Sequence, residues 1–253
     1  MVYVILPAFN EENSIERLIT SFYEDVVLES NINLRLIVVN DGSTDRTEKI
    51  ITKIQKRFFD KFEIILLNHS RNKGLAEALK TGFTYSIDHL EEESSRDIII
   101  AMDADNTHPP AIVLRMVSLI RKGADVVIGS RYRSGSRVIG LSPFRRLMSG
   151  CANWFFRILF ATKGVKDFTC GYRAYRMDVI QKAIERYGEE FISEQGFACT
   201  VDILLKLRAM NFVFVEAPLI LRYDRKEDAS KMKVGQTIFD TLNLAFRRKL
   251  GIL

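Results

Sequence analysis

The sequence predicts an α/β fold in which a doubly wound, mostly parallel sheet carries helices on both faces. In its first half, short runs rich in Ile and Val alternate with longer segments that have apolar residues at three- and four-residue spacing. Strands that alternate with helices of this length are joined by crossovers, which make the strands parallel and cover both faces of the sheet. The 253 residues are 47% hydrophobic and 27% charged, with 14 Gly and 5 Pro, a balance that excludes disordered and collagen-like classes.

Each element follows from its own pattern. The β-branched runs predict strands, whereas the first helical segment places Ile15, Leu18, Ile19 and Phe22 on one face. In chain order we expect a strand at 2–6, a helix at 11–29, a strand at 34–39, a helix at 44–58, a strand at 62–67, a helix at 74–90, a strand at 97–102, a helix at 109–121 and a strand at 124–129.

Other classes of protein lack support in the sequence. Charged residues interrupt every apolar stretch well before the ~18 residues that a membrane span requires. The N-terminus shows neither a basic leader nor a cleavage site, so we expect no secretory signal. Three cysteines without CxxC spacing argue against a disulfide framework or a zinc site and favour a cytoplasmic setting. Neither GxGxxG after the first strand nor GxxxxGK[ST] occurs, so dinucleotide-binding and P-loop folds are disfavoured.

An acidic motif, Asp103-Ala104-Asp105, ends the fourth predicted strand. Alternating carboxylates at a strand end can bind one hard divalent cation, whose remaining positions are filled by water and phosphate oxygens. A solvated turn that caps the next helix is the plainer interpretation of such a motif. Its position, together with a second acidic loop at 40–45, favours a Mg²⁺ or Mn²⁺ site that neutralises a departing diphosphate.

Two further loops carry polar residues at the same edge of the predicted sheet, where ligands of such folds bind. Asp41 can hydrogen-bond a base or a ribose, although the same loop is also typical of a turn and helix cap. Arg71 and Lys73 precede a helix start at Gly74, so two cations and free amides suit a phosphate. Solvent exposure alone is the alternative explanation of these two charges.

Five motifs follow successive strands of the predicted sheet. In order they are Pro7-Ala8-Phe9-Asn10-Glu11, Val39-Asn40-Asp41-Gly42-Ser43-Thr44-Asp45, Asn72-Lys73-Gly74-Leu75-Ala76, Met102-Asp103-Ala104-Asp105 with His108-Pro109-Pro110, and Gly129-Ser130-Arg131-Tyr132. The chain thereby resembles the family 2 inverting glycosyltransferases and, within them, the polyprenyl-phosphate (dolichyl-phosphate) mannose synthases, over roughly residues 2–231. The resemblance implies a GT-A type nucleotide-diphospho-sugar transferase fold. It also implies a metal-dependent, inverting transfer of mannose from GDP-mannose to a polyprenyl (dolichyl) phosphate.

The resemblance further implies residue roles, carried over position by position. It assigns nucleotide binding to Pro7, Phe9, Glu11, Asp41, Lys73, Asp103, Arg225 and Lys231. It assigns the metal to Asp103 and Asp105, the acceptor phosphate to Arg131, Arg145 and Ser149, and catalysis to Asp105, Arg131 and Arg225. It assigns residues 167–173 to the neighbourhood of the sugar, and Arg225 with Ser230 and Lys231 to a closing loop.

Two departures from the family pattern stand out. Thr107 occupies a position where the family often has a metal-binding Gln, which leaves the third protein ligand open. Asp228 occupies a position in the closing loop that usually carries Gly. The three histidines form no metal-binding or catalytic pattern, and His108 before two prolines is typical of a turn.

The excess of positive charge lies in one segment. Residues 126–166 contain eight basic residues and no acidic one; 37 basic residues less these eight leave 29 against 32 acidic ones in the rest of the chain. Large apolar residues, among them the single Trp154, interleave with these cations, which favours an amphipathic segment at a membrane interface. A core helix and a nucleic-acid surface are the alternatives, and the nearly continuous apolar run disfavours nucleic acid.

We therefore expect a catalytic domain over residues 1–231, with an amphipathic interface helix region at 141–163, and a C-terminal amphipathic helical segment at 232–253. The expected location is peripheral, on the cytoplasmic face of a membrane. The C-terminal pattern suits either a membrane surface or a partner helix, such as a membrane-anchoring subunit.

Three alternatives remain open. The donor could be UDP-glucose or UDP-N-acetylglucosamine. The acceptor could be a growing glycan, whose hydroxyl would need a base, for which Asp167 and Glu194 are the candidates. The absence of a QxxRW pattern disfavours the processive enzymes. A non-catalytic adaptor that binds a nucleotide sugar is the third alternative.

Overall fold

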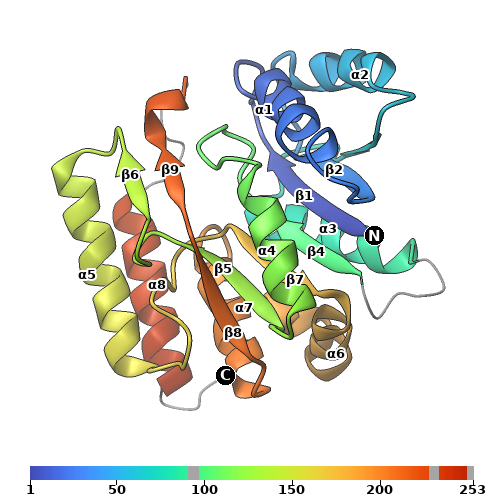
Figure 1. The fold of residues 1–253 in the computed structure, drawn as a ribbon. Helices are drawn as coiled ribbons and strands as arrows, with labels where there is room; N and C mark the ends of the chain where they lie inside the picture. Colours follow the sequence, from blue (N-terminus) through green and yellow to red (C-terminus); the bar gives the residue numbers. More distant parts are fainter. Residues whose placement is uncertain (91–96, 228–233, 250–253) are drawn as a thin grey trace.

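A seven-stranded sheet forms the centre of the protein, whose computed structural model describes residues 1–90, 97–227 and 234–249 (Figure 1). In sheet order the strands are β3 (Glu63–Asn68), β2 (Leu34–Asn40), β1 (Val2–Ala8), β4 (Ile98–Ala101), β7 (Arg173–Arg176), β5 (Val126–Ser130) and β8 (Phe214–Pro218). Neighbouring strands are parallel except at β7, which runs antiparallel to both β4 and β5.

Helices cover both faces of this sheet. They are α1 (Ile15–Phe22), continued by the π-helical η1 (Tyr23–Val27), then α2 (Thr47–Arg57), α3 (Leu75–Asp88), α4 (Ile112–Arg121), α6 (Met177–Tyr187), the short 3₁₀ helix η3 (Gly188–Ile192) and α7 (Ala198–Ala209). Helix α3 packs on β1 and β2, and α4 packs on β5, β7 and β8. Figure 1 shows α4 in front of the sheet and α7 behind it. The predicted doubly wound α/β fold is confirmed.

A smaller layer lies beside the sheet. It contains the short parallel strands β6 (Arg137–Ile139) and β9 (Ile220–Arg222), the 3₁₀ turn η4 (Tyr223–Arg225), and the helices α5 (Pro143–Leu159) and α8 (Val234–Lys249). The two helices lie side by side in Figure 1 and contact one another, and α8 also contacts α7. In the described part of the chain, no helix combines the length and the apolar character that a membrane crossing requires.

The core forms where the sequence patterns predict it. Ile15, Leu18, Ile19 and Phe22, the predicted apolar face of the first helix, are fully buried in the hydrophobic core. The helix itself is shorter than the expected 11–29, because Asn10 adopts a left-handed conformation with φ +53° and the backbone N–H of Glu11 donates to Thr47 Oγ1. These contacts keep the segment after β1 as a loop at the edge of the sheet.

Candidate active site

The residues assigned to the metal, Arg131 and most of those assigned to the nucleotide follow strands whose carboxyl ends lie at one edge of the sheet. Strands β1 to β4 are mutually parallel, and β5 runs in the same direction because β4 and β5 are both antiparallel to β7. The loops after β2 and β3 touch at Gly42, which has φ +66° and whose added Cβ would lie 2.2 Å from the backbone carbon of Arg71. Only glycine permits this approach, so it brings the two loops together.

Asp41 connects these two loops. Its carboxylate accepts hydrogen bonds from the backbone N–H groups of Lys73 (2.9 Å) and Gly74 (2.8 Å), and its Oδ1 lies 2.6 Å from Nδ1 of His69. The second ring nitrogen of His69 lies 2.9 Å from Thr81 Oγ1. The amides of Lys73 and Gly74 are therefore bound to Asp41 and are not the free phosphate donors that the sequence suggests. The contact of His69 with Asp41 has no signal in the sequence.

The loop after β1 carries the other residues assigned to the nucleotide. The N–H of Asn10 donates to Ser43 Oγ (3.0 Å), and its Oδ1 accepts from the N–H of Thr44 (2.8 Å). These bonds join the loops after β1 and β2. Pro7 and Phe9 are half-buried there, and Glu11 is buried.

Asp105 is held by neighbours on both of its carboxylate oxygens. Oδ1 accepts from the N–H (3.1 Å) and the hydroxyl (2.7 Å) of Thr107, and Oδ2 forms a 2.5 Å ion pair with Lys226 Nζ. Thr107, which replaces the Gln of the family pattern, thus orients Asp105. Asp103 lies 3.9 Å from Nδ1 of His108, whose ring packs against Tyr172. His108 is therefore a buried neighbour of the acidic pair as well as a turn residue.

The acidic pair fits a divalent cation. Burial and the neighbouring Asp105 raise the pKa of Asp103. Burial acts to raise the pKa of Asp105 as well, but Lys226, His108 and the hydrogen bond from Thr107 together keep that pKa below its usual range. The pair thus already accommodates one cationic group, and oxygen donors of this type suit Mg²⁺ or Mn²⁺. Within the described ranges, no three His, Cys, Asp or Glu side chains gather as a metal-binding group. Asp103 and Asp105 are the residues that would hold the ion.

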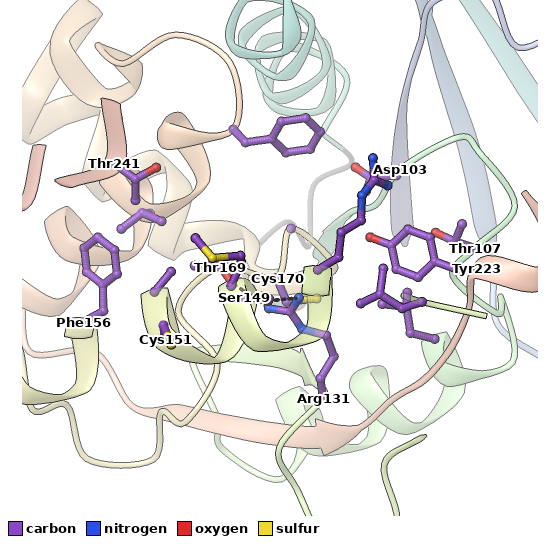
Figure 2. A pocket seen from close by; sticks show the side chains of 18 of the residues that line it. Asp103, Thr107, Arg131, Ser149, Cys151, Phe156, Thr169, Cys170, Tyr223 and Thr241 are labelled. Atoms are coloured by element: carbon purple, nitrogen blue, oxygen red, sulfur yellow. Dashed lines mark hydrogen bonds between the residues drawn. The ribbon is translucent and has the colours of Figure 1, made fainter. Parts of the chain in front are cut away.

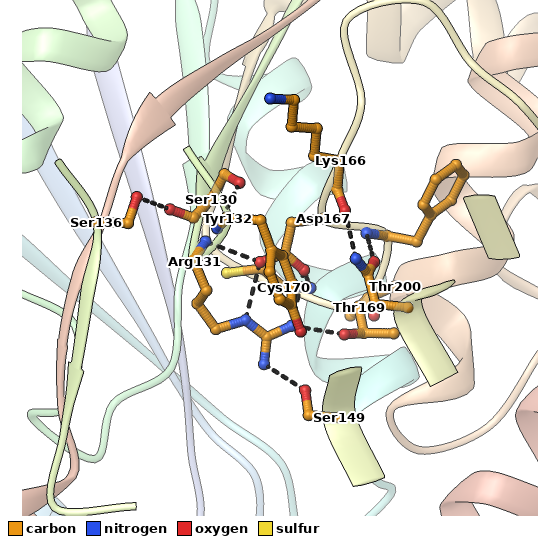
Figure 3. A network of polar contacts seen from close by, with 12 residues as sticks. Ser130, Arg131, Tyr132, Ser136, Ser149, Lys166, Asp167, Thr169, Cys170 and Thr200 are labelled. Carbon is orange, nitrogen blue, oxygen red and sulfur yellow. Dashed lines mark hydrogen bonds and ion pairs between the residues drawn. The ribbon is translucent and has the colours of Figure 1, made fainter. Parts of the chain in front are cut away.

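Arg131 forms the centre of a polar network after β5 (Figure 3). Its Nε and Nη2 donate to the two oxygens of Asp167 at 2.8 and 2.7 Å, in a bidentate pair, and its backbone N–H donates to Asp167 as well. Nη1 donates to Ser149 Oγ at 3.0 Å, and Nη2 also reaches Thr169. Arg131 is therefore held in one orientation, beside Ser149 and with its charge already partnered by a carboxylate.

The two candidate bases are both engaged in ion pairs. Burial acts to raise the pKa of Asp167, but Arg131 outweighs it and holds the pKa below the usual range. Glu194, the other candidate, forms a 2.7 Å ion pair with Arg247 of α8. A buried carboxylate with a lowered pKa is a poor proton acceptor at neutral pH. Arg131, one of the eight basic residues of 126–166, is likewise already paired, with a carboxylate that lies just outside that segment.

A cavity of about 340 Å³ links Asp103 to an apolar groove (Figure 2). Asp103 and Arg131 line one end of it. Arg145 and Ser149 from α5 line it as well, so the three residues assigned to the acceptor phosphate share one cavity. The other end is lined by apolar side chains of α5, α7 and α8, among them Phe155, Phe156, Val201 and Leu242. A second hollow, of about 470 Å³ and next to β6, shares Arg131 and Ser149 with it.

The remaining assigned residues lie apart from this cavity. Pro7, Phe9, Glu11, Asp41 and Lys73 are not among its lining residues. Arg225 is also absent from the lining, whereas the adjacent Lys226, which the motifs do not mark, reaches Asp105. Ser230 and Lys231, like Asp228, lie outside the described residues.

The chain is similar to curated relatives over most of its length. It is 32% identical over 247 residues to the dolichol-phosphate mannosyltransferase of Pyrococcus furiosus, an alignment that covers 97% of this chain and 63% of the relative. It is 27% identical over 251 residues to the polyprenol monophosphomannose synthase of Mycolicibacterium smegmatis, with 98% and 88% covered. The chain thus spans less than two thirds of the length of the Pyrococcus relative.

The fold also has a counterpart among solved structures. A mannosyltransferase from Pyrobaculum calidifontis, solved in complex with GDP-Man and Mn²⁺, superposes with a TM-score of 0.59 at 19% identity and covers 98% of this chain and 64% of its own. The fold is therefore that of a GT-A type nucleotide-diphospho-sugar transferase. The family described as "Glycosyl transferase family 2" matches residues 3–184, and the chain belongs to it. The predictions of this family and of a glycosyltransferase are confirmed.

Proposed function

We propose that the protein transfers mannose from GDP-mannose to a polyprenyl phosphate, with inversion, at a membrane surface. The cavity that joins Asp103 to Arg131, Arg145 and Ser149, and continues into an apolar groove, carries this proposal. A ligand with a phosphate attached to a long apolar chain matches a cavity that is cationic at one end and apolar at the other. The names of the two curated relatives support the same acceptor class.

The donor side is the edge formed by the loops after β1, β2 and β4. Residues there, from Pro7 to Asp105, would bind the nucleotide and its diphosphate. A divalent cation held by Asp103 and Asp105 would neutralise the negative charge of the departing nucleoside diphosphate. The bond from the anomeric carbon to the diphosphate breaks with its electron pair on the leaving group, as an acceptor phosphate oxygen bonds to the opposite face of that carbon.

The acceptor phosphate needs to be positioned, but it does not need to be deprotonated by the protein. A phosphomonoester has a second pKa near ~6 and is largely dianionic at neutral pH, so it requires no general base. The ion pairs of Asp167 and Glu194 agree with this, because neither carboxylate is free to deprotonate a sugar hydroxyl. Arg131 and Arg145 would instead orient the phosphate, the task for which the planar guanidinium is suited.

The outer face of α5 supports action at a membrane. Phe144, Leu147, Trp154 and Ile158 follow one another at spacings of three, seven and four residues, which place them on one face of the helix, and they are each 59–68% exposed. The exposed Arg146 and Arg157 lie on the same helix. An exposed apolar stripe with flanking cations is typical of a helix that lies in the interface of an anionic bilayer.

Vesicles containing anionic phospholipid are expected to shift the emission of Trp154 to the blue. Trp154 is the only tryptophan, so its fluorescence reports on this face alone. Leu147→Glu should weaken the partition of the protein into such vesicles at least tenfold, because burying one Leu is worth about 1.5–3 kcal/mol. Vesicle titration of tryptophan fluorescence measures both effects.

Phe59→Glu is the matched control, since Phe59 is 83% exposed but lies after α2, away from α5. It should leave vesicle binding unchanged. Equal losses in the two variants, or an emission spectrum that does not respond to vesicles, would argue for a protein partner at this face.

The proposed reaction is tested by incubating the full chain with GDP-mannose, Mg²⁺ and a short polyprenyl phosphate. Lipid-linked mannose should form, and UDP-glucose or UDP-N-acetylglucosamine should give less product under the same conditions. Transfer to a free sugar without transfer to the lipid phosphate would contradict the proposal and favour a glycan acceptor.

A further inference from the structure

Lys226 follows η4 directly, and its ammonium group reaches Asp105. Its Nζ lies 2.5 Å from Asp105 Oδ2, and the two side chains are 18% and 12% exposed. Both side chains are thus largely withdrawn from water, so the ammonium compensates the charge of this carboxylate at short range.

The geometry makes Lys226 and a metal ion competitors for a single oxygen. Asp105 Oδ1 already accepts two hydrogen bonds from Thr107, so Oδ2 is the oxygen that remains for a cation. A Mg²⁺ ion bound there would lie about 2.0–2.1 Å from the oxygen, within the space that the Lys226 ammonium fills. At such a short separation, the Lys226 ammonium and the metal ion would also repel one another strongly.

We propose that Lys226 and the divalent cation bind alternately at Asp105 Oδ2. Lys226 is then a positioning residue, which keeps the acidic pair compensated until the metal arrives with the nucleotide. This inference rests on the metal dependence of the proposed function. Lys226 is adjacent to Arg225, so it also gives the segment after β9 a direct contact with the donor side.

Binding of Mn²⁺ to the full chain without nucleotide tests the proposal. Electron paramagnetic resonance of free Mn²⁺ gives the dissociation constant at fixed ionic strength. Lys226→Met should tighten Mn²⁺ binding about tenfold or more, because it removes a unit positive charge next to the ion. Lys226→Arg keeps the charge and should stay within about threefold of the parent protein.

Lys122→Met is the control, because Lys122 is exposed at the end of α4 and should leave Mn²⁺ binding unchanged. Lys226→Gln repeats the test with a polar side chain should the methionine variant fold poorly. If Lys226 had only a structural role, its replacement would lower the melting temperature without tightening Mn²⁺ binding.

Unchanged or weaker Mn²⁺ binding in Lys226→Met and Lys226→Gln would overturn the proposal. Weaker GDP binding with unchanged Mn²⁺ binding would do so as well, since it would make Lys226 a diphosphate ligand. The proposal would also be overturned if neither the parent protein nor the Lys226 variants bound Mn²⁺. Turnover of the parent protein in the lipid-mannose assay, with and without a chelator, separates these outcomes from a failure of the proposed function.

Discussion

Asp105→Asn is expected to lower kcat for lipid-linked mannose by about 10²- to 10³-fold, the range found when one group that stabilises developing charge is removed. The substitution keeps the volume of the side chain and an oxygen that can accept from Thr107. It removes the negative charge that would hold a cation on the diphosphate. Radiolabelled mannose transfer gives the rate.

The fold should survive this change. Lys226, the ion-pair partner of Asp105, is partly exposed at 18% and can regain water. Circular dichroism should therefore give a melting temperature within a few degrees of the parent value. Asp224→Asn serves as the control, because Asp224 pairs with Arg222 near the same turn and its side chain is 36% exposed. Activity of Asp105→Asn within tenfold of the control would remove Asp105 from the proposed metal site.

Asp167→Ala is expected to destabilise the protein by about 3–5 kcal/mol, the cost of breaking one partner out of a buried ion pair. Asp167 is fully buried, and its loss leaves the Arg131 guanidinium, 13% exposed, without its bidentate carboxylate. The N–H of Cys170 loses its acceptor as well. Urea unfolding followed by circular dichroism measures the change.

The exposed cross-strand pair of Arg35 and Glu63 provides the comparison. Their side chains approach to 2.5 Å, closer than the 2.7 Å of Arg131 and Asp167, but that of Glu63 is 47% exposed, so Glu63→Ala should cost no more than about 1 kcal/mol. Equal effects of the two substitutions would show that the Arg131 network does not stabilise the fold.

The pH dependence of stability follows from the same network. Because the folded-state pKa of Asp167 lies below its unfolded value of ~3.9, its contribution is fully present above that value. The contribution is lost as the pH falls through the lower, folded-state pKa. The difference in free energy of unfolding between Asp167→Ala and the parent protein should therefore be largest at neutral pH and should shrink in acid.

The Arg131 network also changes how a variant of Arg131 is interpreted. From the sequence alone, Arg131→Ala is expected to lose turnover without unfolding. From the structure we expect Arg131→Ala to destabilise the protein as well, because the substitution leaves Asp167 buried without its cation. Ser149→Ala and Arg145→Met probe the acceptor phosphate with less damage, since neither side chain belongs to a buried ion pair among the described residues.

The sequence predicts the parallel part of the sheet because its strands are buried on both faces and read as continuous apolar runs. It does not predict β7, which has only four residues, two of them arginines. Arg173 is nevertheless fully buried and donates to the carbonyl oxygens of Thr200 and Phe168. Local composition cannot reveal such a strand, because the partners that satisfy the arginine come from other segments.

Some residues of the candidate site can likewise be predicted from the sequence, whereas their partners cannot. Motif order indicates the acidic pair and Arg131, since each follows a strand end directly. The partners that set their charge, Lys226 for Asp105 and Asp167 for Arg131, lie 121 and 36 positions away. Long-range pairs of this kind leave no periodic signal, so Asp167 looks like a free base and Lys226 is overlooked.

Strand β7 also determines a distance. It lies between β4 and β5, so the acidic pair and Arg131 follow strands that are two strand spacings apart, about 9.5 Å. Without this inserted strand, the two sets of charged groups would stand on neighbouring strands. The separation of the acidic pair from Arg131 is thus set by the backbone hydrogen bonds that hold one short strand in the sheet, rather than by any side chain.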